Sequence, residues 1–240
     1  MEKRFALITG ASGGIGSAIA RKLAAENYSL YLHYNRNEEA IVALIKELSS
    51  YDIELIPIQA DLGDVDGYKH LCKQIFSLHT IVLNSGNSFY GLVTDMDDST
   101  VAQMIQLHVT SPFQLTRNLL PKLMSNRGSI VAVTSIWGQT GSSCEVLYSM
   151  VKGGQNAFIK ALSKETALNG IRVNAVAPGA VSTAMLESFT EEELEILQGD
   201  IPMGRIGEAN EIADVVAFLL SQKASYMTGQ IIGVNGGWYV

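Results

Sequence analysis

The chain is poor in cysteine and in proline, and each shortage excludes a class of protein. Its two cysteines, Cys72 and Cys144, lie far apart and have no cysteine or histidine at the spacing of a zinc-binding motif. Neither a metal site nor a disulfide framework is therefore expected. Five prolines, no low-complexity tract and no internal repeat leave no obvious linker. We expect one α/β domain over residues 1–240, a size that single domains of this class commonly reach.

Long hydrophobic runs and clusters of basic charge are also absent. The first apolar run stops at Ile8, which is too short for the core of a signal peptide or for a membrane span. The longest basic clusters are Lys3-Arg4 and Arg21-Lys22, in a chain of net charge −7, and this argues against a nucleic-acid-binding surface. These absences predict a cytoplasmic protein that binds neither membranes nor nucleic acids.

The sequence does contain a regular alternation of apolar runs and amphipathic segments. Strand-like runs cover residues 5–9, 29–34, 53–58, 80–84, 129–134, 172–177 and 230–234. Helical spacing covers residues 14–27, 37–49, 64–77, 99–124, 146–169 and 208–221. Thr190 is followed three residues later by Glu193, the pattern of a capping box at a helix start. Seven strands alternating with helices predict a single-domain, Rossmann-like, doubly wound parallel sheet with helices on both faces.

A glycine-rich turn follows the first strand-like run and leads into a helical segment. It reads Gly10-Ala11-Ser12-Gly13-Gly14-Ile15-Gly16. Glycines let the backbone approach a pyrophosphate closely, and the free N–H groups of a helix start favour an anion. The turn therefore indicates a dinucleotide site, although an ordinary strand-to-helix connection has the same pattern.

Three polar residues farther along the chain indicate carbonyl chemistry. Tyr148 and Lys152 are one helical turn apart, so their side chains project from one face of a helix. There the cation is expected to lower the pKa of the phenol and to let it hand over a proton near neutrality. Ser135 ends a strand-like run upstream, where its hydroxyl is suited to hold a carbonyl oxygen beside the phenol.

Together these motifs resemble the classical short-chain dehydrogenase/reductase family over nearly the whole chain. The family's Thr-Gly-x-x-x-Gly-x-Gly turn and its Tyr-x-x-x-Lys pair are both present, and Ser135 matches its catalytic serine. Pro178-Gly179 matches the segment after the sixth strand, with Thr183 where the family contacts the nicotinamide carboxamide. The resemblance implies a cofactor-binding part over about residues 1–130 and a catalytic and substrate part over about residues 131–240.

The resemblance also assigns the cofactor contacts. They fall in the glycine-rich turn and at the ends of later strands, although Asp61 is also a residue type that caps a following helix. The residues are Gly10, Ser12, Gly13, Gly14, Ile15, Gly16, Tyr34, Asn35, Arg36, Asp61, Leu62, Asn84, Ser85, Gly86, Tyr148, Lys152, Pro178, Gly179, Val181 and Thr183.

The choice between NADP and NAD depends on the end of the second strand. Where an NAD enzyme has a carboxylate for the ribose 2′-hydroxyl, this chain has Tyr34. Arg36 is suited to pair with a 2′-phosphate, and this favours NADPH over NAD(H). Two observations point the other way. Arginine is common in solvated loops, and Gly13 fills a position that is often basic in the family's NADPH enzymes.

Two departures from the family pattern affect the mechanism. The family's Asn-Asn-Ala-Gly segment is Leu83-Asn84-Ser85-Gly86 here, and His108 stands where a fourth catalytic residue, an asparagine, is expected. The resemblance gives that asparagine the role of holding a water that links the lysine to solvent. Either the backbone carbonyl holds this water, helped by a helix bend near Pro112, or the imidazole joins the relay and titrates near physiological pH.

The resemblance implies reduction of a ketone by hydride transfer from the nicotinamide. Tyr148 is expected to protonate the developing alkoxide and Ser135 to orient the oxygen. Lys152 is expected to lower the pKa of the tyrosine and to bind the nicotinamide ribose. Two further functions stay open, an NAD-dependent alcohol or sugar dehydrogenase and a cofactor-binding regulator without activity, although the retained tyrosine and lysine disfavour the regulator.

Two substrates are suggested. Residues 201–208, 224–230 and 234–237 most resemble the 3-oxoacyl-acyl-carrier-protein reductase branch. Residues 83–86, His108 and residues 137–148 resemble a narrower bacterial subgroup, whose ketone is a 5-aminopentanone group on a lysine of translation elongation factor P. Trp137 and Glu145 are expected to flank the cleft, where a carboxylate suits a substrate amine. Loop packing and a solvated glutamate are the alternative reading.

Specificity and assembly are predicted from the segments around this site. Residues 184–199 are expected to form a substrate lid, because loops set specificity while the scaffold sets chemistry. The helical segments 99–124 and 146–169 and the apolar carboxyl end at residues 236–240 are expected to form contacts in a homo-oligomer, a dimer or a tetramer.

Overall fold

Seven strands form one parallel sheet at the centre of the chain. They are β1 (Arg4–Ile8), β2 (Tyr28–Tyr34), β3 (Leu55–Gln59), β4 (Thr80–Leu83), β5 (Ser129–Val133), β6 (Arg172–Pro178) and β7 (Ile231–Val234). The structure, a computed structural model, describes residues 3–186 and 189–240. The strand order is β3-β2-β1-β4-β5-β6-β7, and every neighbouring pair is parallel. The carboxyl ends of all strands therefore lie at one edge of the sheet.

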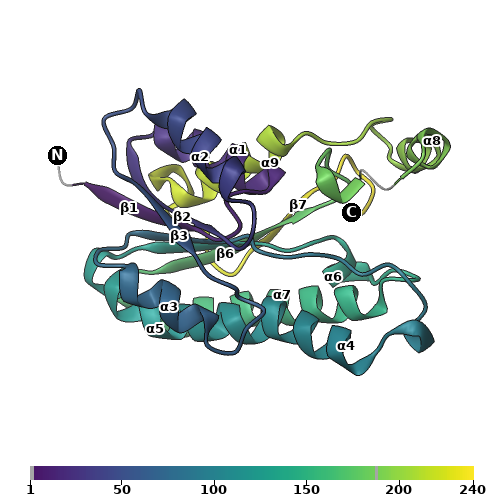
Figure 1. Cartoon of the computed structure of the whole chain (residues 1–240), viewed down its shortest axis with the longest axis horizontal. Coiled ribbons are helices and arrows are strands. Elements are labelled where there is room, and N and C mark those ends of the chain that lie inside the picture. Colours follow the sequence, from purple (N-terminus) through teal and green to yellow (C-terminus); the bar gives the residue numbers. More distant parts are fainter. Residues whose placement is uncertain (1–2, 187–188) are drawn as a thin grey trace.

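Helices cover both faces of the sheet, as predicted (Figure 1). The first face carries α1 (Gly14–Ala25), α2 (Glu38–Leu48) and α9 (Ala209–Leu220). The second face carries α3 (Gly67–Gln74), α4 (Asp98–Ile105), α5 (Ser111–Asn126) and α7 (Val146–Thr166). This arrangement confirms the expected α/β, doubly wound architecture.

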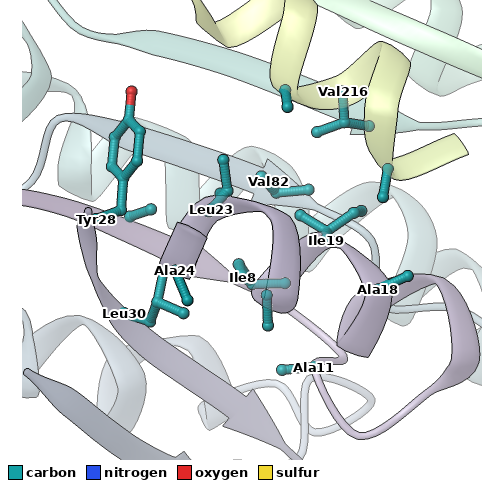
Figure 2. Close-up of a cluster of buried hydrophobic side chains, with 14 of the residues drawn as sticks. Ile8, Ala11, Ala18, Ile19, Leu23, Ala24, Tyr28, Leu30, Val82 and Val216 are labelled. Carbon is teal, nitrogen blue, oxygen red and sulfur yellow. The ribbon is translucent and has the colours of Figure 1, made fainter. Parts of the chain in front are cut away.

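The sheet separates two hydrophobic cores. Because side chains alternate along a strand, Ile8 points into the core shared with α1 and α9, whereas Leu7 points into the core shared with α5 and α7. In the first core Ile19 packs near Val216 (Figure 2). Burying a side chain of this size stabilises the fold by about 1.5–3 kcal/mol. The two cores hold the carboxyl edge of the sheet, and the site on it, in place.

The predicted helix at residues 99–124 is interrupted. Between α4 and α5 the residues Gln106–Thr110 form a π-helical turn, and Pro112 lies at the start of α5. A π turn adds a residue to the turn and weakens the regular ladder of hydrogen bonds. The sequence predicted a bend near Pro112, next to this turn, but not the π-helical turn itself, because the helical spacing continues through residues 106–110.

Several boundaries also differ from the predicted ones. The third strand begins at Leu55, two residues late, and α3 is shorter than the predicted segment 64–77. The capping box at Thr190 and Glu193 is confirmed and begins α8 (Glu191–Asp200). The predicted helical segment 146–169 ends in a short 3-10 helix, η3 (Ala167–Asn169). Short helices that were not predicted are η1 (Val93–Asp95), α6 (Trp137–Thr140), η4 (Ala184–Leu186) and η5 (Gln222–Ala224). In the described part of the chain no helix is long and apolar enough to cross a membrane.

Candidate active site

The glycine-rich turn is built so tightly that side chains are excluded. Gly10 has a φ of 68°, and the N–H of Gly13 donates to its carbonyl at 3.2 Å. A Cβ on Gly16 would collide with the same carbonyl oxygen. A Cβ on Gly14 would lie 2.8 Å from Cγ2 of Thr183, so the loop after β6 rests against the turn. The predicted pyrophosphate turn and the predicted carboxamide contact therefore lie side by side.

Asn84 and Ser85 fix this turn from the neighbouring strand. The Asn84 side-chain amide donates to the carbonyls of Thr9 and Gly10 at 3.0 and 3.1 Å. The Thr9 hydroxyl accepts from the backbone N–H groups of Asn84 and Ser85 at 2.8 and 3.0 Å. Asn84 thus has a structural role in the turn, and the other asparagine of the family segment is not needed for it.

A buried histidine that was not predicted also supports the turn. Nδ1 of His33 accepts from the N–H of Gly10 at 3.0 Å, and Nε2 lies 3.0 Å from the carbonyl of Ala60. These partners assign the proton to Nε2. Burial lowers the pKa of His33 to about 4, so the ring is neutral and Nδ1 is free to accept. The signal in the sequence was a polar residue inside an otherwise apolar strand.

The residues predicted to choose the cofactor lie at the end of β2. Tyr34 is buried, whereas Asn35 and Arg36 are exposed. Among the described residues Arg36 has no ion-pair partner, so its guanidinium is available to an anion. Asp61 accepts from the N–H of Gly63 at 2.8 Å within the turn that precedes α3. The N-cap residue of α3 is Asp66, so the alternative that Asp61 caps the following helix is wrong.

Ser135, Tyr148 and Lys152 lie together at the carboxyl end of β5. All three are buried. The Ser135 hydroxyl lowers the pKa of the Tyr148 phenol through a hydrogen bond and accepts from the N–H of Trp137 at 3.2 Å. Nζ of Lys152 lies 5.6 Å from the centre of the Tyr148 ring and donates to the carbonyl of Val133 at 3.0 Å. The predicted trio is therefore one cluster.

Lys152 was expected to lower the pKa of the Tyr148 phenol. That prediction is wrong, because the pKa of Tyr148 is raised. Burial raises the pKa of Tyr148, and the nearby carboxylate of Glu145 raises it further, against the weaker effect of Ser135. Burial also lowers the pKa of Lys152 to about 7. Because desolvation disfavours both charged forms, the pair is close to a neutral phenol and a partly neutral amine at pH 7.

His108 packs against the same cluster from the π turn. Its ring meets the Tyr148 ring edge to face, with 5.9 Å between the centres. A Cβ on Gly86 would lie 2.7 Å from Cε1 of His108. Its Nε2 lies 2.9 Å from the carbonyl and 3.3 Å from the N–H of Asn87, and the shorter contact favours the proton on Nε2. Nδ1 is buried and has no partner among the described residues.

His108 was expected to act either through its backbone carbonyl, which would hold a water, or through an imidazole that titrates. Burial and the nearby Lys152 lower its pKa to about 3, so the prediction that the imidazole titrates near physiological pH is wrong. Its backbone carbonyl accepts from Nε2 of Gln155 at 2.7 Å, a partner that was not predicted. A signal for Gln155 was present, because it lies three residues after Lys152 and seven after Tyr148 and therefore shares their helix face.

Trp137 packs against the cluster that contains Tyr148, and the carboxylate of Glu145 lies close enough to raise the pKa of Tyr148; that the two residues flank a substrate cleft remains a prediction. The Trp137 ring contacts Trp238 edge to face, with 4.9 Å between the centres. Glu145 is half-buried, and burial raises its pKa while hydrogen bonds with Trp137 and Ser142 lower it. Trp238 was missed because nothing in the local sequence connects the carboxyl end with residue 137.

Two predicted features remain predictions. The lid at residues 184–199 includes residues 187–188, which lie outside the described residues; the neighbouring described parts are η4 and α8. The homo-oligomer also remains a prediction, although α5 and α7 expose Phe113 and Met150. In the described ranges no group of three metal-ligating side chains occurs.

Comparison with known proteins agrees with this geometry. A family model described as Enoyl-(Acyl carrier protein) reductase matches residues 10–239. The chain belongs to the short-chain dehydrogenase/reductase family. An "uncharacterized oxidoreductase YmfI" of Bacillus subtilis is 57% identical over 237 residues, with 98% of each chain covered. The 3-oxoacyl-[acyl-carrier-protein] reductase FabG of Staphylococcus aureus is 35% identical over 240 residues, again with 98% of each covered.

Solved structures of short-chain dehydrogenase/reductase type superpose over nearly the whole chain. The angucycline C-6 ketoreductase LanV with bound NADP has a TM-score of 0.92 and 28% identity, covering 97% of this chain and 94% of that one. A blue fluorescent protein from a metagenomic library, in complex with NADPH, has a TM-score of 0.93 and 26% identity, covering 99% and 98%. Membership of the family makes the chain an NAD(P)-dependent oxidoreductase that acts on CH–OH or C=O groups.

Proposed function

We propose that the chain is an NADPH-dependent ketone reductase whose proton chemistry is performed by Ser135, Tyr148 and Lys152. The observation that carries the proposal is the gathering of these three buried side chains at the carboxyl edge of the sheet, the edge that also carries the glycine-rich turn. Ligands bind at this edge in open parallel sheets. The bound NADP and NADPH of the similar solved structures support the choice of cofactor.

The residues present fit a dinucleotide. The start of α1 offers free N–H groups beside glycines that a Cβ would obstruct, which suits a pyrophosphate. Arg36 is exposed and free to pair with a 2′-phosphate. Thr183 lies against Gly14, where the carboxamide of the nicotinamide is expected. When bound, the reduced cofactor supplies the hydride.

Ser135 and Tyr148 would handle the ketone oxygen. The Ser135 hydroxyl fixes the oxygen, and the phenol of Tyr148 protonates it as negative charge develops. A raised pKa keeps the phenol protonated before the reaction, and an alkoxide is a much stronger base than a phenolate. The ammonium form of Lys152 would then stabilise the phenolate and supply the proton that restores the phenol. An amine with a pKa of about 7 exchanges protons readily at neutral pH.

The substrate we propose first is a 3-oxoacyl group on acyl carrier protein. This rests on the 35% identity to a reductase of that name along almost the entire chain. The second candidate is the 5-aminopentanone group on elongation factor P. It is favoured by the half-buried carboxylate of Glu145 beside Tyr148, because a carboxylate suits an amine and a plain acyl chain has none.

Side-by-side assays separate these substrates. NADPH oxidation is measured with an acetoacetyl carrier thioester and with aminopentanone-modified elongation factor P, each with the parent chain and with Tyr148→Phe. Faster turnover of one substrate, lost in the variant, identifies the physiological class. If the parent oxidises NADPH with neither of them, nor with a simple β-ketoester, the proposed reductase function is wrong.

A further inference from the structure

The imidazole of His33, on β2, lies where three loops at the carboxyl edge of the sheet meet. The ring is buried, and its two nitrogens contact residues that follow β1, β3 and β4. Nδ1 accepts from the N–H of Gly10 at 3.0 Å and lies 3.4 Å from Oγ of Ser85, and Nε2 lies 3.0 Å from the carbonyl of Ala60. One side chain therefore joins the glycine-rich turn to two other loops in which cofactor contacts are expected.

The backbone partners of the ring fix its proton. An amide N–H only donates and a carbonyl only accepts, so Nδ1 carries no proton and Nε2 carries one. Burial lowers the pKa of His33 to about 4 against the opposing effects of Ala60 and Asp61, and the ring therefore keeps this neutral form at pH 7. A protonated ring would place a second N–H against the N–H of Gly10.

The peptide group between Thr9 and Gly10 is held from both sides. His33 accepts from its N–H, and the side-chain amide of Asn84 donates to its carbonyl at 3.0 Å. The backbone carbonyl of His33 also accepts from the N–H of Ala11 at 2.8 Å. With this peptide group fixed, Gly10 keeps its φ of 68°, a conformation that favours glycine. The turn that leads into α1 is thereby held in one form before a ligand binds.

Packing alone does not require a histidine at this place. A buried ring with two polar nitrogens costs free energy unless both are hydrogen-bonded, and an apolar side chain would fill the same space in β2 without that condition. What the histidine adds is an acceptor for the N–H of Gly10, which no apolar side chain offers.

We propose that His33 is a positioning residue for NADPH, because its neutral ring holds the glycine-rich turn in the form that binds the pyrophosphate. A turn that already has its bound form loses less conformational entropy when the ligand binds. The inference rests on the proposed function only in taking NADPH as the ligand of the turn, and it is independent of which ketone is reduced.

Two amide substitutions separate the roles of the two ring nitrogens. The oxygen of asparagine lies as many bonds from Cβ as Nδ1 does, so His33→Asn keeps an acceptor for Gly10. The amide nitrogen of glutamine matches Nε2 in the same way, so His33→Gln keeps the donor to Ala60 and loses the acceptor. We expect the dissociation constant for NADPH to rise about tenfold or more in His33→Gln, the loss expected for a buried N–H without an acceptor, and to stay within about threefold of the parent in His33→Asn.

A control on the same strand shows whether lost stability by itself explains the result. The Ser29 hydroxyl accepts from the N–H of Glu54 at 3.0 Å near the amino end of β2, so Ser29→Ala also removes an acceptor from a backbone N–H. Ser29→Ala and His33→Gln should both lower the melting temperature, but only His33→Gln should raise the dissociation constant for NADPH. His33→Gln should also lose less in kcat at saturating NADPH than in kcat/KM for NADPH.

A measurement on the parent chain needs no variant. Nitrogen NMR of isotope-labelled histidines should show His33 with its proton on Nε2, both with and without NADPH. The opposite tautomer, or a charged ring at pH 7, would overturn the role of His33. So would an unchanged dissociation constant in His33→Gln, an equal rise in His33→Asn, or an equal rise in Ser29→Ala.

The same titrations separate failure of this role from failure of the reductase. NADPH binding that weakens in His33→Gln, without reduction of any ketone by the parent, would overturn the proposed function and keep the role of His33. Reduction by the parent, with equal NADPH affinity in the parent and His33→Gln, would overturn the role and keep the function. A parent chain that binds no NADPH would overturn both.

Discussion

The side-chain amide of Gln155 donates a 2.7 Å hydrogen bond to the backbone carbonyl of His108. This bond joins α7 to the π turn at the place where the turn departs from the regular helical ladder. It holds the imidazole edge to face against Tyr148. His108 therefore acts on the tyrosine through packing and position, as a neutral ring.

We expect His108→Asn to leave the pH dependence of turnover unchanged in shape. Because the pKa of His108 is about 3, the ring is already neutral throughout the range of the assay and does not titrate there. The measurement is kcat/KM from pH 5.5 to 9 for the parent, His108→Asn and the exposed-histidine control His70→Asn. An inflection present in the parent and missing only in His108→Asn would show that the ring titrates.

Removal of the phenol should abolish turnover without removing the cofactor. In Tyr148→Phe the ketone oxygen has no proton donor, so kcat should fall on the order of 10²–10⁴-fold. The dissociation constant for NADPH, measured by titration of cofactor fluorescence, should stay within about twofold of the parent, since the glycine-rich turn is untouched. Tyr226→Phe, at a fully exposed tyrosine, is the matched control. Turnover near the parent level in Tyr148→Phe would exclude the phenol as the acid.

A methyl group in the glycine-rich turn should weaken cofactor binding. In Gly16→Ala the new Cβ meets the carbonyl oxygen of Gly10, and this backbone oxygen cannot move without opening the turn. We expect NADPH affinity to fall by tenfold or more, about 1.4 kcal/mol or above, together with a lower melting temperature. Gly199→Ala, where nothing lies within 4 Å of the added Cβ, should change neither. Equal NADPH affinity and equal melting temperature in Gly16→Ala and Gly199→Ala would contradict the structure of the turn.

Arg36 should select the phosphorylated cofactor. Arg36→Leu removes the exposed guanidinium at the end of β2. A charge-assisted hydrogen bond contributes about 1.5–3 kcal/mol, so kcat/KM for NADPH should fall by about 10–100-fold. The value of kcat/KM for NADH should change little. Steady-state kinetics with both cofactors gives the ratio. Lys46→Leu is a control that removes an equal charge from α2. An equal fall in kcat/KM with NADH would show that Arg36 contacts a part of the cofactor other than the 2′-phosphate.

Buried His33 should make folding stability fall in mild acid. Its pKa is about 4 in the folded chain and about 6.5 when unfolded, so between these values only the unfolded chain binds the proton. Stability contributed by the neutral ring is therefore present above about pH 6.5 and is lost as the pH falls, by up to about 1.4 kcal/mol per pH unit.

Urea unfolding between pH 7 and pH 5 checks this expectation. The slope of the free energy of unfolding against pH should be smaller in His33→Gln than in the parent by up to the same amount, about 1.4 kcal/mol per pH unit. His70→Gln, at an exposed histidine, is the matched control. An equal slope in His33→Gln and the parent would show that His33 is not held neutral.

The sequence determined the fold class and the motif residues of the candidate site. Strand-like runs and helical spacing are local properties of the chain, so the order of strands and helices was readable from them. The glycines of residues 10–16 and the pair Tyr148 and Lys152 were readable for the same reason, since each motif places its groups through local geometry.

Only the tertiary structure decided how these groups behave. The pKa values of Tyr148, Lys152 and His108 depend on how completely the surrounding chain removes water from them, and desolvation has no local signature in the sequence. The same is true of Trp238 against Trp137, a contact between segments far apart in the chain. The order of the residues fixed which groups meet at the edge of the sheet, and packing fixed their charge, their partners and the surface that they offer to a substrate.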